Sequence, residues 1–243
     1  MGDIRSRVIV ALDTADLGTA RGLVQALDGR PAWYKVGMEL FYSAGWEAVD
    51  MVSSSGASVF LDIKFHDIPN TVAGACRSCA RKGVGMFSMH AAAGAVAMRE
   101  AVRAADDARE KSGARPRLIG VTVLTSIDEK ALREEVGMAG SVISNVVRLA
   151  VLCKECGLDG VVASPLEAAA IREAVGPGFL IVTPGIRPSW SVTGDQRRHT
   201  TPRQALLGGA DHIVVGRPIT AAPDPLEAYL RVCEEIEQVG ERK

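Results

Sequence analysis

The sequence predicts an α/β fold of the (β/α)8 barrel type, in a single domain over residues 1–243. The length of 243 residues is close to the roughly 250 that are typical of such barrels. Short apolar runs alternate with amphipathic helical stretches along the whole chain, a pattern that favours parallel β–α units. The apolar runs are rich in Val and Ile rather than alternating with polar residues, as expected for strands that are buried on both faces.

Eight apolar runs predict eight strands, enough to close a barrel of the TIM type. In chain order these strands are expected at Val8–Leu12, Trp33–Gly37, Ser58–Ile63, Gly85–His90, Leu118–Leu124, Gly160–Ala163, Phe179–Thr183 and His212–Gly216. Helical periodicity predicts the intervening helices at Leu17–Leu27, Leu40–Ser54, Thr71–Lys82, Ala95–Lys111, Ser141–Cys156, Leu166–Ala174 and Pro202–Leu207, with a last helix at Pro225–Gln238. Because no linker or charge block divides the chain, we expect one domain.

Composition excludes several classes of partner. The formal net charge is −1, so no overall positive field would recruit nucleic acid or an anionic membrane. No stretch approaches the roughly 18 apolar residues of a membrane span, and Val8–Leu12 is too short for the core of a signal peptide. We therefore expect a cytoplasmic protein whose ligand is recognised by a local site.

The five cysteines raise the question of a metal site. Two pairs, Cys76 with Cys79 and Cys153 with Cys156, have the C-x-x-C spacing of half a zinc site. Both pairs fall in predicted helices that another helix would separate, and neither has a glycine-rich knuckle. We interpret the cysteines as small buried hydrophobic residues rather than metal ligands. The odd count also argues against a disulfide framework.

The run Asp62-Ile63-Lys64-Phe65-His66-Asp67 is the most informative feature of the chain. It places an ammonium between two carboxylates at the end of an apolar strand, and charged residues are rarely buried unless they are paired. Side chains alternate along a strand, so Asp62 and Lys64 are expected to point the same way. The alternative is a structural ion pair, with Asp67 helping to cap the helix that Pro69 opens.

Further polar residues lie within, at the end of or just after the other predicted strands, and the active sites of barrels collect at the carboxyl ends of the strands. They are Asp13, Lys35, His90, Thr125 with Ser126, Arg187, and Gly216 with Arg217. Taken together with Asp62 and Lys64, they predict two acids and two bases around one mouth of the barrel. For Asp13 the alternative is a helix cap, because Thr14 and Asp16 follow it. For His90 the alternative is a structural histidine; His66 and His199 suggest no partner.

Two features at the C-terminal end of the chain point to a phosphate. The loops after strands 7 and 8 are the usual phosphate location in barrels, and there Gly216-Arg217 offers close backbone approach and a forked guanidinium. Between the last two strands, Pro184–Thr201 forms a long irregular stretch with three arginines and Trp190. A loop of this length usually has a function, often as a lid.

These residues also match a known family. The ten residues Asp62–Thr71 resemble the signature of the orotidine 5′-phosphate decarboxylases, in their compact bacterial form. The resemblance continues through Ala11–Asp13, Tyr34–Gly37, Val121–Ser126, Val182–Pro188, Asp195–Arg198 and Val215–Pro218. Together these segments include every polar strand end described above except His90.

The resemblance implies decarboxylation of orotidine 5′-monophosphate to uridine 5′-monophosphate, the final step of de novo pyrimidine synthesis, without a metal or an organic cofactor. It implies that Lys64 donates a proton to C6, that Asp62 lies beside the departing carboxylate, and that Lys35 and Asp67 complete a charge network. It further implies a homodimer in which Asp67 and Thr71 reach the neighbouring protomer's site. The remaining contacts that it implies are Asp13 and Lys35 on the ribose, Thr125 on the pyrimidine with Ser126 beside it, and Gln196, Gly216, Arg217 and Arg187 on the phosphate.

Two other readings remain open from the residues. The nearest is a Mg²⁺-dependent sugar-phosphate decarboxylase or aldolase-type enzyme on the same barrel, which would share the Asp-x-Lys-x-x-Asp pattern. Phe65-His66 and Gln196 fit the orotidylate enzyme better. The other is a non-catalytic barrel that only binds a phosphorylated ligand, against which the combination of Asp62, Lys64 and Asp67 argues.

Overall fold

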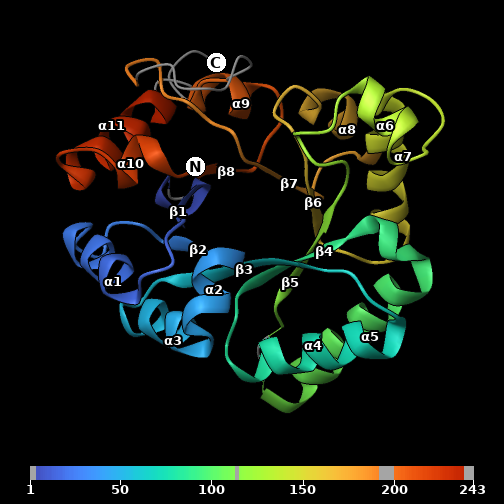
Figure 1. Cartoon of the computed structure of the whole chain (residues 1–243), viewed down its shortest axis with the longest axis horizontal. Coiled ribbons are helices and arrows are strands. Elements are labelled where there is room, and N and C mark those ends of the chain that lie inside the picture. Colours follow the sequence, from blue (N-terminus) through green and yellow to red (C-terminus); the bar gives the residue numbers. More distant parts are fainter. Residues whose placement is uncertain (1–3, 113–114, 192–199, 238–243) are drawn as a thin grey trace. The chain divides into compact units, whose positions relative to one another are not determined.

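The computed structural model describes residues 4–112, 115–191 and 200–237. Eight parallel strands follow one another in chain order around a closed barrel, the (β/α)8 TIM barrel that the sequence predicts (Figure 1). The strands are β1 Val8–Leu12, β2 Trp33–Gly37, β3 Ser58–Phe65, β4 Met86–His90, β5 Arg117–Val121, β6 Gly160–Val162, β7 Leu180–Thr183 and β8 His212–Val215.

Helices separate the strands along the chain. They are α1 Leu17–Ala26, α2 Met38–Ala44, α3 Trp46–Ser54, α4 Pro69–Arg81, α5 Gly94–Ser112, α6 Glu129–Glu134, α7 Val142–Glu155, α8 Ala168–Val175, α9 Pro202–Leu207, α10 Arg217–Thr220 and α11 Pro225–Glu237, with short 3₁₀ turns at Ile4–Arg7 and Ala91–Ala93. Among the residues described, no helix is both long enough and apolar enough to cross a membrane.

The structure corrects several predicted boundaries. The single helix predicted at Leu40–Ser54 is wrong, because Gly45 adopts φ 58 and ψ −142 and divides it into α2 and α3. The strand predicted to reach Leu124 ends at Val121, since the Leu124 carbonyl accepts a turn hydrogen bond from the Ile127 N–H. The short helices α6 and α10 were not predicted.

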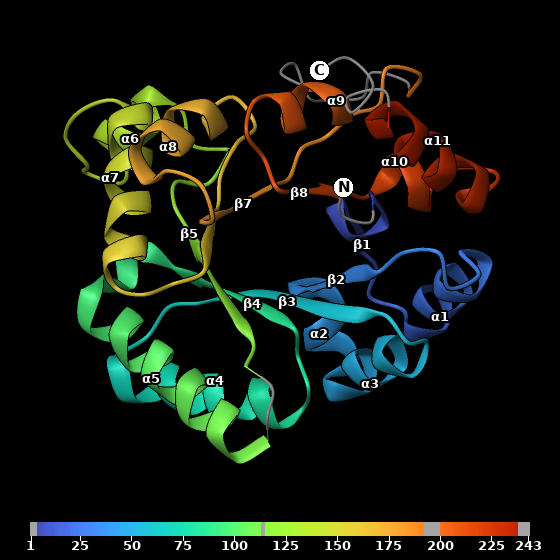
Figure 2. The ribbon, with the colours of Figure 1, turned by 180° about the vertical axis from the view of Figure 1, so that it is seen from behind.

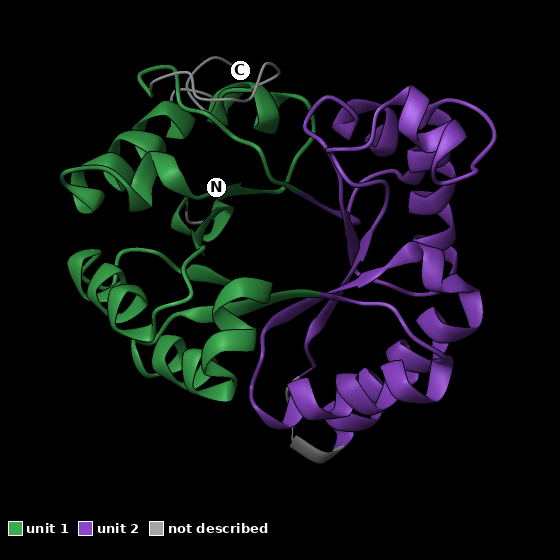
Figure 3. Cartoon of the chain, viewed as in Figure 1, with its two compact units in different colours: residues 1–63, 183–243 green, residues 64–182 purple. Residues whose placement is uncertain are grey.

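The chain divides into two compact units, residues 1–63 with 183–243 and residues 64–182 (Figure 3). The first unit is discontinuous in sequence, and the second is one continuous segment. The prediction of a single domain over residues 1–243 is not tested by this division and stays a prediction.

In the first unit, β1 is buried along its whole length. It pairs with β2, where Ala11 aligns with Lys35, and with β8, where Val10 aligns with Val215. Complete burial explains why its sequence is continuously apolar rather than alternating. This central position fixes the point at which Asp13 leaves the strand.

In the second unit, α4 and α5 lie side by side in both views (Figures 1 and 2). The Cys76 thiol on α4 donates to the Ala101 carbonyl on α5 across 3.2 Å. A close approach also occurs between α7 and β5, where a Cβ on Gly120 would lie 2.3 Å from the Cys153 Sγ. Glycine at this strand position therefore makes room for the helix.

All five cysteines are buried, which confirms the interpretation of them as small hydrophobic residues. Burial raises the pKa of the Cys76, Cys79 and Cys153 thiols to about 12. In the described part of the chain, no three His, Cys, Asp or Glu residues form a group that could hold a metal ion.

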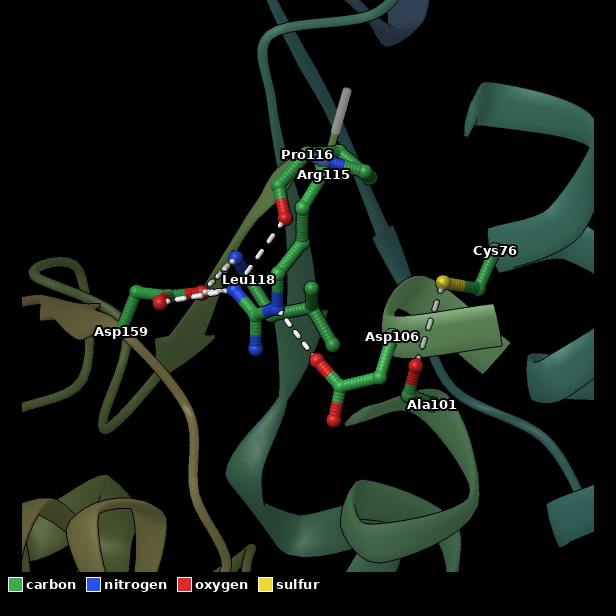
Figure 4. Close-up of polar contacts among 7 residues, drawn as sticks. All are labelled: Cys76, Ala101, Asp106, Arg115, Pro116, Leu118 and Asp159. Carbon is green, nitrogen blue, oxygen red and sulfur yellow. Dashed lines mark hydrogen bonds and ion pairs between the residues drawn. The ribbon is translucent and has the colours of Figure 1, made fainter. Parts of the chain in front are cut away.

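Arg115 joins three elements of the second unit (Figure 4). Its Nη1 lies 2.8 and 2.6 Å from the two carboxylate oxygens of Asp159, and its Nε donates to Asp106 Oδ1 on α5 across 2.7 Å. Asp159 also accepts from the Leu118 N–H of β5 across 2.7 Å. Burial acts to lower the pKa of Arg115, but the hydrogen bonds to Asp159 and Asp106 outweigh it and raise that pKa.

Candidate active site

Three charged residues of the first unit form a connected row, in which Asp13 follows β1, Lys35 lies within β2 and Asp62 lies within β3. Lys35 Nζ lies 2.8 Å from Asp13 Oδ1 and 3.8 Å from Asp62 Oδ2. The Lys35 and Asp62 side chains are only 12% and 13% exposed, whereas Asp13 is 56% exposed. Two nearly buried charges are costly to keep in a fold unless they are paired or used. The row thus brings together three of the predicted site residues.

The helix-cap alternative for Asp13 is wrong. Asp16 caps α1, since its side chain accepts the Thr19 N–H across 2.6 Å. That hydrogen bond lowers the pKa of Asp16. Asp13 is therefore left to pair with Lys35.

Two glycines lie beside this row. A Cβ on Gly37 would come within 2.8 Å of Lys35 Nζ and 3.3 Å of Asp13 Oδ1, while a Cβ on Gly216 would lie 3.5 Å from Asp13 Oδ2. Gly37 is thus required for the observed position of the Lys35 ammonium. Gly216 lies at ordinary contact distance from Asp13, which connects the end of β8 to the row.

The second unit begins at Lys64, whose backbone is unusual. Its φ of 54 lies in the left-handed region, which costs an ordinary L-residue about 1–2 kcal/mol. The Lys64 N–H donates to Ser88 Oγ on β4 across 3.0 Å. The predicted direction of the Lys64 side chain assumed regular strand geometry, and that assumption fails at this residue.

After the half-buried Phe65, the residues His66, Asp67 and Ile68 are exposed. His66 and His90 place their ring centroids 5.3 Å apart, so each histidine has a partner that the sequence did not suggest. Asp67 accepts the N–H of the adjacent Ile68 across 2.7 Å, but the N-cap of α4 is Ile68, without a side-chain cap. Asp67 therefore does not cap that helix, and its exposed carboxylate lies just before Pro69 with Thr71 in the first turn of α4.

Thr125 and Ser126 lie in the exposed turn that follows β5. This turn is closed by the hydrogen bond from the Ile127 N–H to the Leu124 carbonyl, 2.9 Å long. Both hydroxyls are thus presented by a defined turn at the carboxyl end of a strand, as the sequence predicts.

The predicted phosphate arginines line one pocket of about 350 Å³ in the first unit. Its lining consists of Arg187, Trp190, Ser191, Arg217, Pro218, Ala221, Ala222 and Pro223. Two guanidinium groups in one pocket suit an anion with several oxygens. Gln196, another predicted phosphate ligand, lies outside the described residues.

The long segment after β7 is held at its two ends. Ile186 forms a parallel bridge with Thr200, and the Arg187 N–H donates to the Thr200 carbonyl across 3.0 Å. Trp190 lies within the segment, and the Arg231 guanidinium of α11 is 4.3 Å from the centre of its ring, a cation–π distance. These contacts fix the wall of the pocket from which Arg187 extends.

Sequence reasoning missed Ser88. The signal was present, because Ser88 is a polar residue within the apolar run Met86–Met89 and is completely buried. A buried hydroxyl in a strand needs a hydrogen-bond partner, but the sequence does not identify that partner as Lys64.

The chain is similar to known proteins along nearly its whole length. Residues 6–232 match the model of the "Orotidine 5'-phosphate decarboxylase / HUMPS family". A protein named orotidine 5′-phosphate decarboxylase from Moorella thermoacetica is 52% identical, with 97% of this chain and 94% of that protein covered. A protein of the same name from Syntrophomonas wolfei is 49% identical, with 96% and 99% covered.

Solved structures agree with the sequence comparisons. The crystal structure of orotidine 5′-phosphate decarboxylase from Lactobacillus acidophilus has a TM-score of 0.85 at 37% identity, covering 95% of this chain and 99% of that one. The site geometry, the match over residues 6–232 and the identity of about half to curated relatives lead to one conclusion. The chain belongs to the orotidine 5′-phosphate decarboxylase family.

Proposed function

We propose that Lys64, Asp62, Asp67 and Lys35 carry the chemical step of this chain's reaction. The chain is a carboxy-lyase that converts orotidine 5′-monophosphate to uridine 5′-monophosphate, the final step of pyrimidine biosynthesis. The observation that carries the assignment is the row Asp13–Lys35–Asp62, which holds a nearly buried ammonium between two carboxylates.

The reaction explains why an ammonium is needed. Loss of CO₂ from C6 leaves a carbanion whose charge cannot spread into the π system of the ring. An ammonium held against C6 stabilises that charge as it develops and then supplies the proton. We assign this role to Lys64, with Asp62 beside the departing carboxylate and Lys35 and Asp67 completing the alternation of charge.

Comparing the repulsion energy with the barrier reduction shows how much Asp62 can contribute to the rate. Repulsion between Asp62 and the substrate carboxylate would raise the ground-state energy and vanish as CO₂ leaves. Two unit charges 4 Å apart interact by about 4 kcal/mol at an effective dielectric constant of 20. The largest enzymatic accelerations require roughly 20 kcal/mol or more. Stabilisation of the carbanion and binding energy from the remote phosphate must therefore supply most of the rate.

The rest of the substrate is assigned to the strand ends. Asp13 and Lys35 would contact the ribose, and Thr125 the pyrimidine edge, with Ser126 beside it. Arg187 and Arg217, which line one pocket, would bind the phosphate together with Gly216 and Gln196. A phosphate is remote from C6, but its binding can hold a loop closed over the reacting groups.

We further propose a cytoplasmic homodimer with shared active sites. Asp67 and Thr71 would reach the neighbouring protomer's site across a two-fold axis. Their exposure on one chain supports this proposal, since Asp67 has only its adjacent Ile68 N–H as a described hydrogen-bond partner.

The names of the relatives do not favour the Mg²⁺-dependent alternative. One assay separates that alternative from metal-independent decarboxylation through Lys64. The absorbance change of orotidine 5′-monophosphate is followed with EDTA present, for the wild type, Lys64→Ala and the exposed control Lys130→Ala. Turnover should survive EDTA and remain in Lys130→Ala. It should be lost in Lys64→Ala, which should still bind uridine 5′-monophosphate. Near wild-type turnover in Lys64→Ala would exclude Lys64 as the proton donor.

A further inference from the structure

The left-handed backbone of Lys64 requires an explanation. Among the non-glycine residues that the structure describes, only Asp28 and Lys64 have a positive φ, at 47 and 54. Asp28 lies in the tight turn after α1, where an aspartate tolerates this conformation. A lysine within a strand has no such local reason. Neighbouring elements must therefore hold Lys64 in place.

Ser88 supplies one such constraint. Its side chain is fully buried on β4, and its Oγ accepts the Lys64 N–H across 3.0 Å. The positive φ of Lys64 departs from regular strand geometry, and the Ser88 Oγ contact lies at this same residue. A partly buried N–H without an acceptor is unfavourable, so the Ser88 oxygen helps to stabilise this conformation.

A second contact flanks the first on the same two strands. Phe65, which follows Lys64, and Phe87, which precedes Ser88, place their ring centroids 5.4 Å apart in an edge-to-face arrangement. The aromatic pair fixes the backbone on one side of the hydrogen bond. An aromatic ring pair does not accept the Lys64 N–H, however, whereas the Ser88 oxygen does.

We propose that Ser88 is a positioning residue for Lys64. Its hydroxyl oxygen holds the Lys64 backbone in the left-handed conformation, and this conformation sets the direction in which the Lys64 ammonium is presented to the reacting carbon. The proposal rests on the proposed function, in which Lys64 donates the proton. A misplacement of about 1 Å in such a group costs up to a hundredfold in rate.

Three substitutions separate hydrogen bonding from packing. Ser88→Ala removes the acceptor, Ser88→Cys keeps nearly the same volume but offers only a weak acceptor, and Ser88→Thr keeps the hydroxyl. We expect Ser88→Ala and Ser88→Cys to lower kcat about ten- to a hundredfold, with KM for orotidine 5′-monophosphate changed by less than about threefold. Ser88→Thr should restore most of the kcat.

Ser78→Ala on α4 is the control, since it removes a serine hydroxyl that makes two hydrogen bonds elsewhere in the same unit. Its kcat should equal that of the wild type. The proposal is overturned if Ser88→Cys is as active as the wild type, or if the loss falls on KM with kcat unchanged. Should Ser88→Ala fail to fold, the comparison of Ser88→Cys with Ser88→Thr decides.

Lys64→Ala distinguishes the two levels of the inference. If Lys64→Ala is inactive while Ser88→Ala and Ser88→Cys keep the wild-type kcat, only the role of Ser88 is wrong. If Lys64→Ala keeps wild-type turnover, the proposed function of Lys64 is wrong, and Ser88 has no ammonium to position.

Discussion

The position of the Lys35 ammonium depends on Gly37, two residues further along the chain, because glycine has no Cβ. Gly37 has φ −87, a backbone conformation that alanine adopts without strain. Its hydrogen is nevertheless needed, because a Cβ there would lie 2.8 Å from Lys35 Nζ. In Gly37→Ala the new Cβ would displace the ammonium at the end of the flexible Lys35 side chain. The fold would therefore be kept, but the row Asp13–Lys35–Asp62 would be disturbed.

Gly37→Ala should therefore affect activity more than stability. We expect kcat/KM to fall at least about tenfold, the size of one lost charge-assisted contact, with Tm changed by no more than about 2 °C. Gly22→Ala is the control, because a Cβ at that helical position meets nothing within 4 Å. Equal activity of the two variants would show that the position of Lys35 Nζ does not matter for turnover.

Arg217→Ala tests the phosphate assignment at the same scale. A charge-assisted contact of roughly 1.5–3 kcal/mol corresponds to about ten- to a hundredfold in kcat/KM for orotidine 5′-monophosphate. The effect should be far smaller for the nucleoside orotidine, which lacks the phosphate. Steady-state kinetics on both substrates check this, and a similar loss on both would mean that Arg217 does not act through the phosphate.

At the scale of elements, Arg115 connects the beginnings of β5 and β6 to α5 through Asp159 and Asp106. Removing the guanidinium leaves two carboxylates without their cation, of which Asp159 is 28% exposed and Asp106 56% exposed. Neither carboxylate then has the cation that offset its desolvation. The consequence falls on stability, since none of the three residues is assigned to the reaction.

We expect Arg115→Ala to lower the free energy of unfolding by about 2 kcal/mol. For a protein of this size that corresponds to a Tm about 4–8 °C lower, with kcat at 25 °C unchanged. Arg103→Ala is the matched control, because its ion pair with Glu100 is an exposed helical one with the arginine 71% exposed. An equal loss in both variants, measured by thermal unfolding, would refute the special role of Arg115.

The buried thiols on α4 and α7 make a prediction about alkaline pH. The folded-state pKa of Cys76, Cys79 and Cys153 is about 12, above the ordinary value of 9. Unfolded chains therefore release these protons first as the pH rises, and stability is lost between pH 9 and pH 12. By pH 10.5 the loss should reach up to about 2 kcal/mol per thiol.

Urea unfolding at pH 8 and pH 10.5 measures this loss. The double variant Cys76→Ala with Cys79→Ala starts from a lower stability because it leaves cavities. It should nevertheless lose less stability than the wild type between the two pH values. The same pH-dependent loss in both proteins would mean that other groups cause it.

At the scale of the whole molecule, the strand order and barrel class could be predicted because strand sequences buried on both faces are continuously apolar. The ends of β1, which is buried at every residue, were predicted without error for this reason. The break at Gly45 could not be predicted, since a helix tolerates a single glycine at a cost of about 1 kcal/mol.

The candidate site, too, could be predicted from the sequence only in part. The strand-end acids and lysines and the two pocket arginines could be found in the sequence, because charges after apolar runs are conspicuous. The backbone of Lys64 could not, because the oxygen that stabilises it belongs to the next strand, 24 residues along the chain. In the sequence, such a tertiary contact is indicated only by a polar residue within an apolar run.

The proposed shared site also belongs to this scale. If Asp67 serves the neighbouring protomer, a heterodimer of Lys64→Ala and Asp67→Ala subunits contains one site with both residues intact. Mixing the two inactive variants should therefore restore activity at about a quarter of all sites or fewer, given random exchange. Turnover is measured after subunit exchange has been verified with labelled chains. A mixture that stays inactive would count against sharing.

The discontinuity of the first unit has a consequence for the order of events on the ribosome. β1 pairs with β8 through Val8 and Ile213, so its second neighbour is synthesised about 200 residues later. At roughly 5–20 residues per second, this delay lasts on the order of 10–40 s. Residues 64–182 are by then all available to their own unit, while one edge of a fully apolar strand still awaits its partner. During that interval the unpaired edge of β1 must be shielded, because such an edge can pair with other chains.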